Sequence, residues 1–151
     1  MTNLGVLYLQ GQGVPQDDAE ALRLMRKAAA AGEPRAMANL GAMYADGRGV
    51  DRDYTAAADW FRKAADAGIA DAMRRLGSAY RLGRGVPRDA AEAARWFRRA
   101  AEAGDLEGMV RLGDLYEAGE GVAKDSAESL RWYRKAAEAG HVKAKSYVGF
   151  A

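Results

Sequence analysis

The chain has 151 residues, no cysteine and one histidine, and its 23 basic and 21 acidic residues give a net charge of +2. The absence of cysteine excludes disulfide scaffolds, thiolate metal sites and cysteine nucleophiles, and a single histidine excludes a His-rich metal site. Apolar residues make up 49% of the chain, too many for a disordered protein, and no apolar run approaches the roughly 18 residues of a membrane-spanning helix. The composition therefore favours a helical binding protein.

The sequence repeats itself along its whole length with a period of 36 residues. In register are the glycines Gly5, Gly41, Gly77, Gly113 and Gly149, the tyrosines Tyr8, Tyr44, Tyr80 and Tyr116, and G-x-G-V motifs that begin at Gly11, Gly47, Gly83 and Gly119. No insertion interrupts the period, which indicates a tandem array of one supersecondary unit. We expect repeats over residues 1–32 (with a truncated first helix), 33–68, 69–104 and 105–140, and a partial repeat over 141–151.

The first helix of each repeat is predicted over residues such as 34–45, where Met37, Leu40 and Tyr44 form one apolar stripe. Gly41 lies in this stripe, although glycine inside a helix costs up to about 1 kcal/mol relative to alanine. Its recurrence in every repeat predicts a close contact between helices that a Cβ atom would obstruct.

The second helix of each repeat has recognisable ends. In three of the four repeats, an aspartate that can cap the helix is followed three residues later by a glutamate, an acidic form of the capping box. These pairs are Asp17 with Glu20, Asp89 with Glu92 and Asp125 with Glu128. In the second repeat, apolar residues follow a helical period from Ala57 through Trp60 and Phe61 to Ala65. Gly68 stands where a left-handed residue commonly ends a helix.

Two such helices cannot bury their apolar faces alone, whereas stacked repeats can cover one another. The sequence therefore predicts an all-α fold: a right-handed α/α superhelical solenoid of about four 36-residue helix–turn–helix repeats, with no sheet.

The repeated motif A-M-x-x-L-G-x-x-Y-x-x-G-x-G-V, followed by W-[FY]-R-K-A-A-x-A-G, resembles the Sel-one-like repeat (SLR) family of tetratricopeptide-like proteins over essentially the whole chain. The resemblance implies a non-enzymatic interaction scaffold or adaptor. A cysteine-paired bacterial branch of this family is linked to β-lactam binding or hydrolysis. This chain has none of those cysteines, so we do not transfer that activity.

Several motifs have both a functional and a structural interpretation. The G-x-G-V loops lack the preceding strand of a phosphate-binding loop, so we interpret them as helix–helix turns. Trp60, Trp96 and Trp132 share one repeat position and are predicted to pack in the core. His141 is expected to be a solvated surface residue, because no second metal ligand lies nearby in sequence. No serine has a histidine in a related position, so we predict no enzymatic activity, no cofactor and no metal.

A partner-binding surface is expected on the first helices, because these line the concave groove of tetratricopeptide-like proteins. A helical wheel of the second repeat supports this by placing residues 38, 42, 45 and 46 opposite the buried stripe. The predicted partner-binding residues are Arg35, Ala38, Asp46, Asp71, Arg74, Ser78, Arg81, Leu82, Glu107, Val110, Asp114 and Glu117. The groove would present a basic patch and then an acidic patch, which suits an extended peptide of mixed charge. Alternatively, Arg81 pairs with Glu117, its counterpart one repeat later.

The leading interpretation is a protein–protein interaction scaffold or adaptor that binds a protein or an extended peptide. A second is a regulatory or targeting segment of a larger enzyme or signalling protein. A third, a nucleic-acid or membrane-surface binder, depends on arginines that recur on the second helix. These are Arg26, Arg62, Arg98 and Arg134. We interpret them as a solvated face, and we expect no nucleic-acid binding and no membrane insertion.

Both ends of the sequence fall inside a first helix, since Met1 occupies the repeat position of Met37. Neither end shows the polar outer face of a terminal repeat, so we expect a fragment of a longer array or a gene model begun at an internal methionine. The composition suggests a bacterial source. The compartment stays open between the cytoplasm and, if a signal peptide precedes the sequence, the periplasm or the exterior. The sequence predicts no particular oligomeric state.

Overall fold

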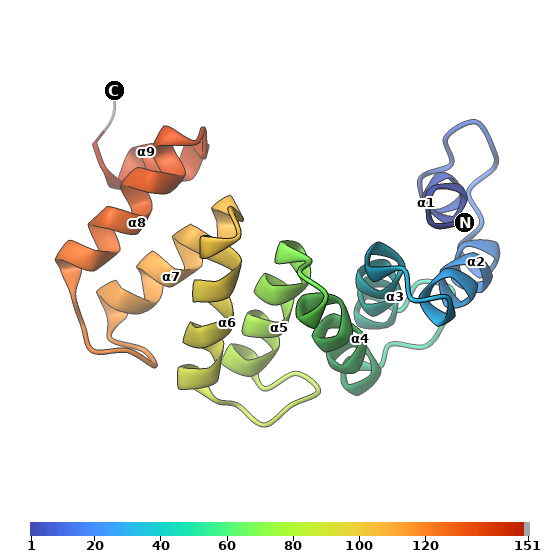
Figure 1. The fold of residues 1–151 in the computed structure, drawn as a ribbon, viewed down its shortest axis with the longest axis horizontal. Helices are drawn as coiled ribbons and strands as arrows, with labels where there is room; N and C mark the ends of the chain where they lie inside the picture. The colour runs from blue at the N-terminus through green and yellow to red at the C-terminus, as the bar shows by residue number, and fades with distance from the viewer. Residues whose placement is uncertain (150–151) are drawn as a thin grey trace. The chain divides into compact units, whose positions relative to one another are not determined.

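The computed structural model describes residues 1–149, in which nine α-helices and no strands are found (Figure 1). The helices are α1 (Thr2–Gln10), α2 (Asp18–Ala30), α3 (Pro34–Asp46), α4 (Tyr54–Asp66), α5 (Ala70–Leu82), α6 (Ala90–Glu102), α7 (Leu106–Ala118), α8 (Ser126–Glu138) and α9 (Val142–Tyr147). From α2 to α8, every helix has 13 residues. The predicted all-α fold of repeated helix–turn–helix units is therefore confirmed for the described part of the chain.

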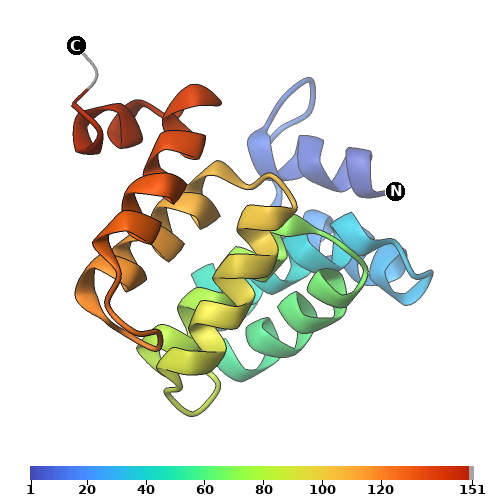
Figure 2. The same ribbon diagram turned by 60° about the vertical axis from the view of Figure 1, so that its left-hand side comes forward.

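The chain divides into two compact units, which we call the first and the second unit. The first comprises Met1–Ala72 with Arg84–Val86, and the second comprises Met73–Gly83 with Pro87–Ala151. In the first unit, α2 packs on α1 and α3, and α3 packs on α4 (Figure 1). In the second unit, α7 packs on α6 and α8, and α8 packs on α9 (Figure 2).

Each unit has its own apolar core, built largely from alanine and from a few larger side chains. In the first unit, Met25 and Leu40 are fully buried among alanines of α2 and α3. In the second unit, Phe97, Leu112 and Leu115 are fully buried between α6 and α7. Alanine at the contacting positions lets the helices approach closely, and the larger residues fill the remaining space.

The glycine inside each first helix lies against a large side chain of the second helix of the same repeat. A Cβ atom at Gly41 would lie 2.7 Å from the ring of Phe61, and one at Gly113 would lie 2.6 Å from the ring of Tyr133. Carbon atoms pack favourably at about 3.5–4.0 Å, so neither position has room for a methyl group without movement of the ring. The predicted close contact between helices is confirmed.

The aspartate before each second helix caps it as predicted, but the reciprocal half of the capping box is not formed. Asp89 accepts a hydrogen bond from the backbone N–H of Glu92 at 3.0 Å. The Glu92 side chain binds Arg95 at 2.5 Å instead of reaching back, because the Asp89 N–H already donates to the carbonyl oxygen of Tyr80 at 2.9 Å. The same cap and the same bond to a tyrosine carbonyl occur at Asp17, Asp53 and Asp125. This bond joins the end of each first helix to the start of the second.

The second glycine of the G-x-G-V loop packs on the preceding repeat. Gly121 has a φ of 73°, and a Cβ atom there would lie 2.1 Å from the carbonyl oxygen of Ala90, the first residue of α6. A Cβ atom at Gly49 would likewise lie 2.5 Å from the carbonyl oxygen of Asp18. Glycine is therefore required both for its positive φ and for its lack of a side chain. The interpretation of these loops as helix–helix turns is confirmed.

The tryptophans are core residues in two of three repeats. Trp96 and Trp132 are 5% and 4% exposed, whereas Trp60 is half-buried with the Lys63 ammonium 4.4 Å from its ring centroid. The arginines predicted to form a solvated face are partly engaged by the first helices. Arg26 donates to the Tyr44 hydroxyl at 3.1 Å, and Arg98 donates to the Tyr116 hydroxyl.

Candidate partner-binding site

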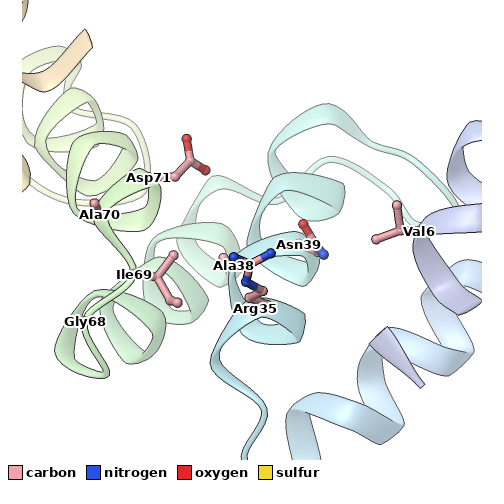
Figure 3. A pocket seen from close by; sticks show the side chains of 8 residues that line it. All are labelled: Val6, Arg35, Ala38, Asn39, Gly68, Ile69, Ala70 and Asp71. Atoms are coloured by element: carbon pink, nitrogen blue, oxygen red, sulfur yellow. The ribbon is translucent and has the colours of Figure 1, made fainter. Parts of the chain in front are cut away.

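An open pocket lies on the first-helix side of the first unit (Figure 3). Its walls come from α1, from α3 and from the turn that leads into α5, and it encloses about 510 Å³. The lining residues are Val6, Arg35, Ala38, Asn39, Gly68, Ile69, Ala70 and Asp71, and we call this site the unit-1 pocket. Its volume lies in the range of roughly 300–1,000 Å³ that is typical of ligand-binding clefts, and it combines apolar walls with a few polar groups.

The unit-1 pocket brings together three of the predicted residues, Arg35, Ala38 and Asp71. The other five lining residues were not among the predicted partner-binding residues; they are Val6, Asn39, Gly68, Ile69 and Ala70. Ile69 occupies the position just before a first helix, where the other repeats carry a polar side chain, and this exception in the sequence was the available signal.

The predicted partner-binding residues differ in their exposure, and four of the twelve are exposed. Arg35, Asp46, Leu82 and Glu117 are exposed, and Asp71, Arg74, Ser78, Arg81, Glu107 and Asp114 are half-buried. For Ala38 and Val110, which share one repeat position, the prediction is wrong, because they are only 8% and 4% exposed. Val110 packs with Tyr133 of α8 and Ala144 of α9. A helical wheel treats one helix at a time, so it misses the burial of Val110 by residues of α8 and α9.

The predicted basic patch is neutralised within the second unit. Arg74 pairs with Asp105 at 3.1 Å, and the two side chains are 24% and 19% exposed. Arg81 binds Glu120 through two nitrogens, Nε at 3.2 Å and Nη2 at 3.1 Å. The alternative of an Arg81–Glu117 pair is therefore wrong about the partner, because Arg81 reaches the glutamate in the loop after α7. Neither arginine is an unpaired cation for a ligand.

Two acids of the predicted acidic patch, Glu107 and Asp114, are also satisfied internally, through an arginine that sequence reasoning overlooked. Arg111 binds Glu107 at 2.9 Å and lies 3.8 Å from Asp114. Asp114 in turn accepts a hydrogen bond from the Tyr133 hydroxyl at 2.6 Å. Burial and this bond to Asp114 raise the pKa of Tyr133 well above its ordinary value. The i to i+4 spacing of Glu107 and Arg111 was the sequence signal for this network.

His141 takes part in the same network and is not the solvated residue that was predicted. Its ring is only 15% exposed; Nε2 lies 2.9 Å from Glu107, and Nδ1 accepts the backbone N–H of Ala144 at the start of α9. Burial alone would raise the pKa of Glu107, but the His141 hydrogen bond and the charge of Arg111 outweigh it, so this pKa is lowered. The histidine therefore caps a helix and links α7 to α9.

Within residues 1–149, no group of three or more histidine, cysteine, aspartate or glutamate side chains is placed to hold a metal ion. No helix in this range has the length and apolar character needed to cross a membrane.

The Sel1 repeat family model matches residues 1–33, 34–69, 70–105 and 106–141. The fold is similar to that of a Sel1 repeat protein from Oxalobacter formigenes, with 39% identity and a TM-score of 0.93 over 98% of this chain and 60% of that one. It is similar to c5321, a protective antigen of uropathogenic Escherichia coli strains that displays an SLR fold, with 38% identity and a TM-score of 0.92 over 99% of this chain and 32% of that one.

Helicobacter pylori cysteine-rich protein B shares the fold at 23% identity, with a TM-score of 0.70 over 87% of this chain and 95% of that one. No curated protein matches the sequence. The chain thus spans about 60% and 32% of the lengths of the two structures that it matches at more than 35% identity.

Proposed function

Because the chain belongs to the Sel1 repeat family, whose proteins generally mediate protein–protein interactions and are generally non-catalytic, we propose that it is a scaffold or adaptor that binds an extended segment of a partner protein on its first helices. The observation that carries this proposal is the unit-1 pocket, an open site of about 510 Å³ formed by first helices and by the turn that leads from α4 into α5. An extended segment can enter such a pocket with one side chain while its backbone follows the surface.

The pocket is a better anchor than the charged patches of the second unit. A partner that used Arg74 or Glu107 would first have to displace Asp105 or Arg111, and the gain from a new ion pair would be offset by the loss of the old one. We propose that the residues left exposed on the first helices add secondary contacts within their own units. These are Asp46, Leu82 and Glu117, together with the half-buried Ser78.

Selection from a peptide library tests the proposal. Random twelve-residue segments are displayed as internal loops of a carrier protein and selected on the immobilised full chain, and the selected peptides are then titrated into ¹⁵N-labelled protein. We expect the largest amide shifts in α3 and in residues 68–71. Peptides that shift only the second helices would place the binding surface elsewhere and overturn the proposal.

A variant at Ile69 tests the apolar wall without disturbing the fold. Asp105 occupies the same repeat position and caps α7 by accepting the Gly108 N–H at 2.7 Å, so Ile69→Asp introduces a residue that this repeat already accommodates. Loss of a buried isoleucine contact is worth about 1.5–3 kcal/mol, so the selected peptide should bind at least about 10-fold more weakly. The control Thr55→Asp adds the same charge at an exposed position of α4 and should leave Kd unchanged. Equal binding by wild type and Ile69→Asp would contradict the proposed anchor.

A further inference from the structure

Arg35 is the cation of the unit-1 pocket, and within residues 1–149 it forms no ion pair. Its side chain is exposed, and within the same residues it forms no hydrogen bond. The residue one helical turn further on is Asn39, which carries no charge to match it. Arg35 also lies in the first turn of α3, where the helix dipole disfavours a cation. The fold itself therefore gains little from a positive charge at this position.

In the second unit, the charged residue at the same repeat position is paired internally. Glu107 stands there, two repeats after Arg35, and it is bound by Arg111 and His141 at 2.9 Å each. In the first unit, the corresponding neighbours are Asn39 and Ile69, neither of which can pair with a guanidinium by charge. The site that is closed by internal ion pairs in the second unit is thus open in the first.

Part of the pocket wall is apolar, although Asn39 and Asp71 also line it. Val6 of α1, Ala38 of α3 and Ile69 before α5 all line it, as Figure 3 shows. A small inorganic anion would leave these walls in contact with water, whereas an apolar side chain would cover them.

We infer that the unit-1 pocket selects a partner segment in which an aspartate or glutamate stands next to an apolar residue. The carboxylate binds the guanidinium of Arg35, which can offer two parallel N–H donors, and the apolar side chain enters the pocket between Val6, Ala38 and Ile69. This specificity rests on the proposed function, since it assigns the chemistry of the partner that the first helices bind.

The test repeats the library selection on three full-length proteins: wild type, Arg35→Glu and Lys27→Glu. Arg35→Glu places at this position the residue that the repeat carries at Glu107, so the fold tolerates it. Lys27→Glu makes the same change of charge on the exposed face of α2. Because the segments are displayed as internal loops, they present no free C-terminal carboxylate. Any acid preference therefore comes from aspartate or glutamate side chains.

Wild type and Lys27→Glu should both enrich segments that contain an acid beside an apolar residue. Arg35→Glu should lose this preference and bind the wild-type peptide at least about 10-fold more weakly, because a hydrogen bond to a charged group contributes about 1.5–3 kcal/mol. Groove-bound peptides without an acid preference, or an acid preference that survives in Arg35→Glu, would overturn this inference alone. Failure to select any peptide that shifts α3 would overturn the proposed function and this inference with it.

Discussion

Replacing Gly121 by alanine should destabilise the protein through one contact between repeats. The new Cβ atom would lie 2.1 Å from the carbonyl oxygen of Ala90, and this oxygen belongs to the first turn of α6 and cannot rotate away. Two costs add at this position. Holding alanine at a φ of 73° costs about 1–3 kcal/mol, and relieving the overlap by moving the loop or the helix costs about another 1–3 kcal/mol. We therefore expect Gly121→Ala to lose about 2 kcal/mol or more.

Two glycines separate the backbone strain from the contact. Gly13 holds the same loop position at a φ of 75°, and Gly104 ends α6 at a φ of 93°; a Cβ atom at either would meet nothing within 4 Å. Gly13→Ala and Gly104→Ala should therefore show the cost of the backbone conformation alone. Urea unfolding followed by far-UV circular dichroism measures all three variants. If the loss in free energy of unfolding for Gly121→Ala is no larger than that for either control, the close contact with Ala90 does not contribute to stability.

Two further predictions concern the ends of helices. Asp89→Ala removes the cap of α6 and should cost about 1 kcal/mol in urea unfolding, whereas Glu102→Ala at the other end of α6 should cost nothing. Because the folded-state pKa of Glu107 is lowered, its contribution to stability is present above the ordinary glutamate pKa and is lost as pH falls through the lowered value. The thermal midpoint of Glu107→Gln should thus fall less between pH 7 and pH 3 than that of wild type or of the exposed control Glu117→Gln. An equal fall in all three proteins would contradict this prediction.

The fold could be predicted from the sequence because its main determinants are local and are repeated in register. The glycine in each first helix, the aspartate before each second helix and the glycine after it can each be recognised within a few residues. The bond from the Asp89 N–H to the Tyr80 carbonyl could not be predicted in this way, because the capping-box pattern considers only residues inside one helix. The glutamate was then free to bind Arg95 three residues later.

The charged surface of the second unit was harder to predict, because its charges are satisfied between repeats and not in a fixed register. Arg74 binds Asp105, 31 residues later, and Arg81 binds Glu120, 39 residues later. A search at the repeat period of 36 residues therefore selects the wrong acid for Arg81. Long arginine side chains reach helix caps and loops near their counterpart position, so the repeat period alone does not identify the partner.

One repeat position accounts for much of the difference between the two units. The residue before each first helix is Glu33, Ile69, Asp105 or His141. Asp105 and His141 each cap the following helix and also bind a side chain of the preceding first helix, Arg74 or Glu107. Glu33 accepts a hydrogen bond from the hydroxyl of Thr2. Isoleucine can do neither. At Ile69 the surface therefore has an apolar wall, and Arg35 in the same pocket forms no ion pair within the described part of the chain. The residue at this one position thus determines whether this surface is closed by internal pairs.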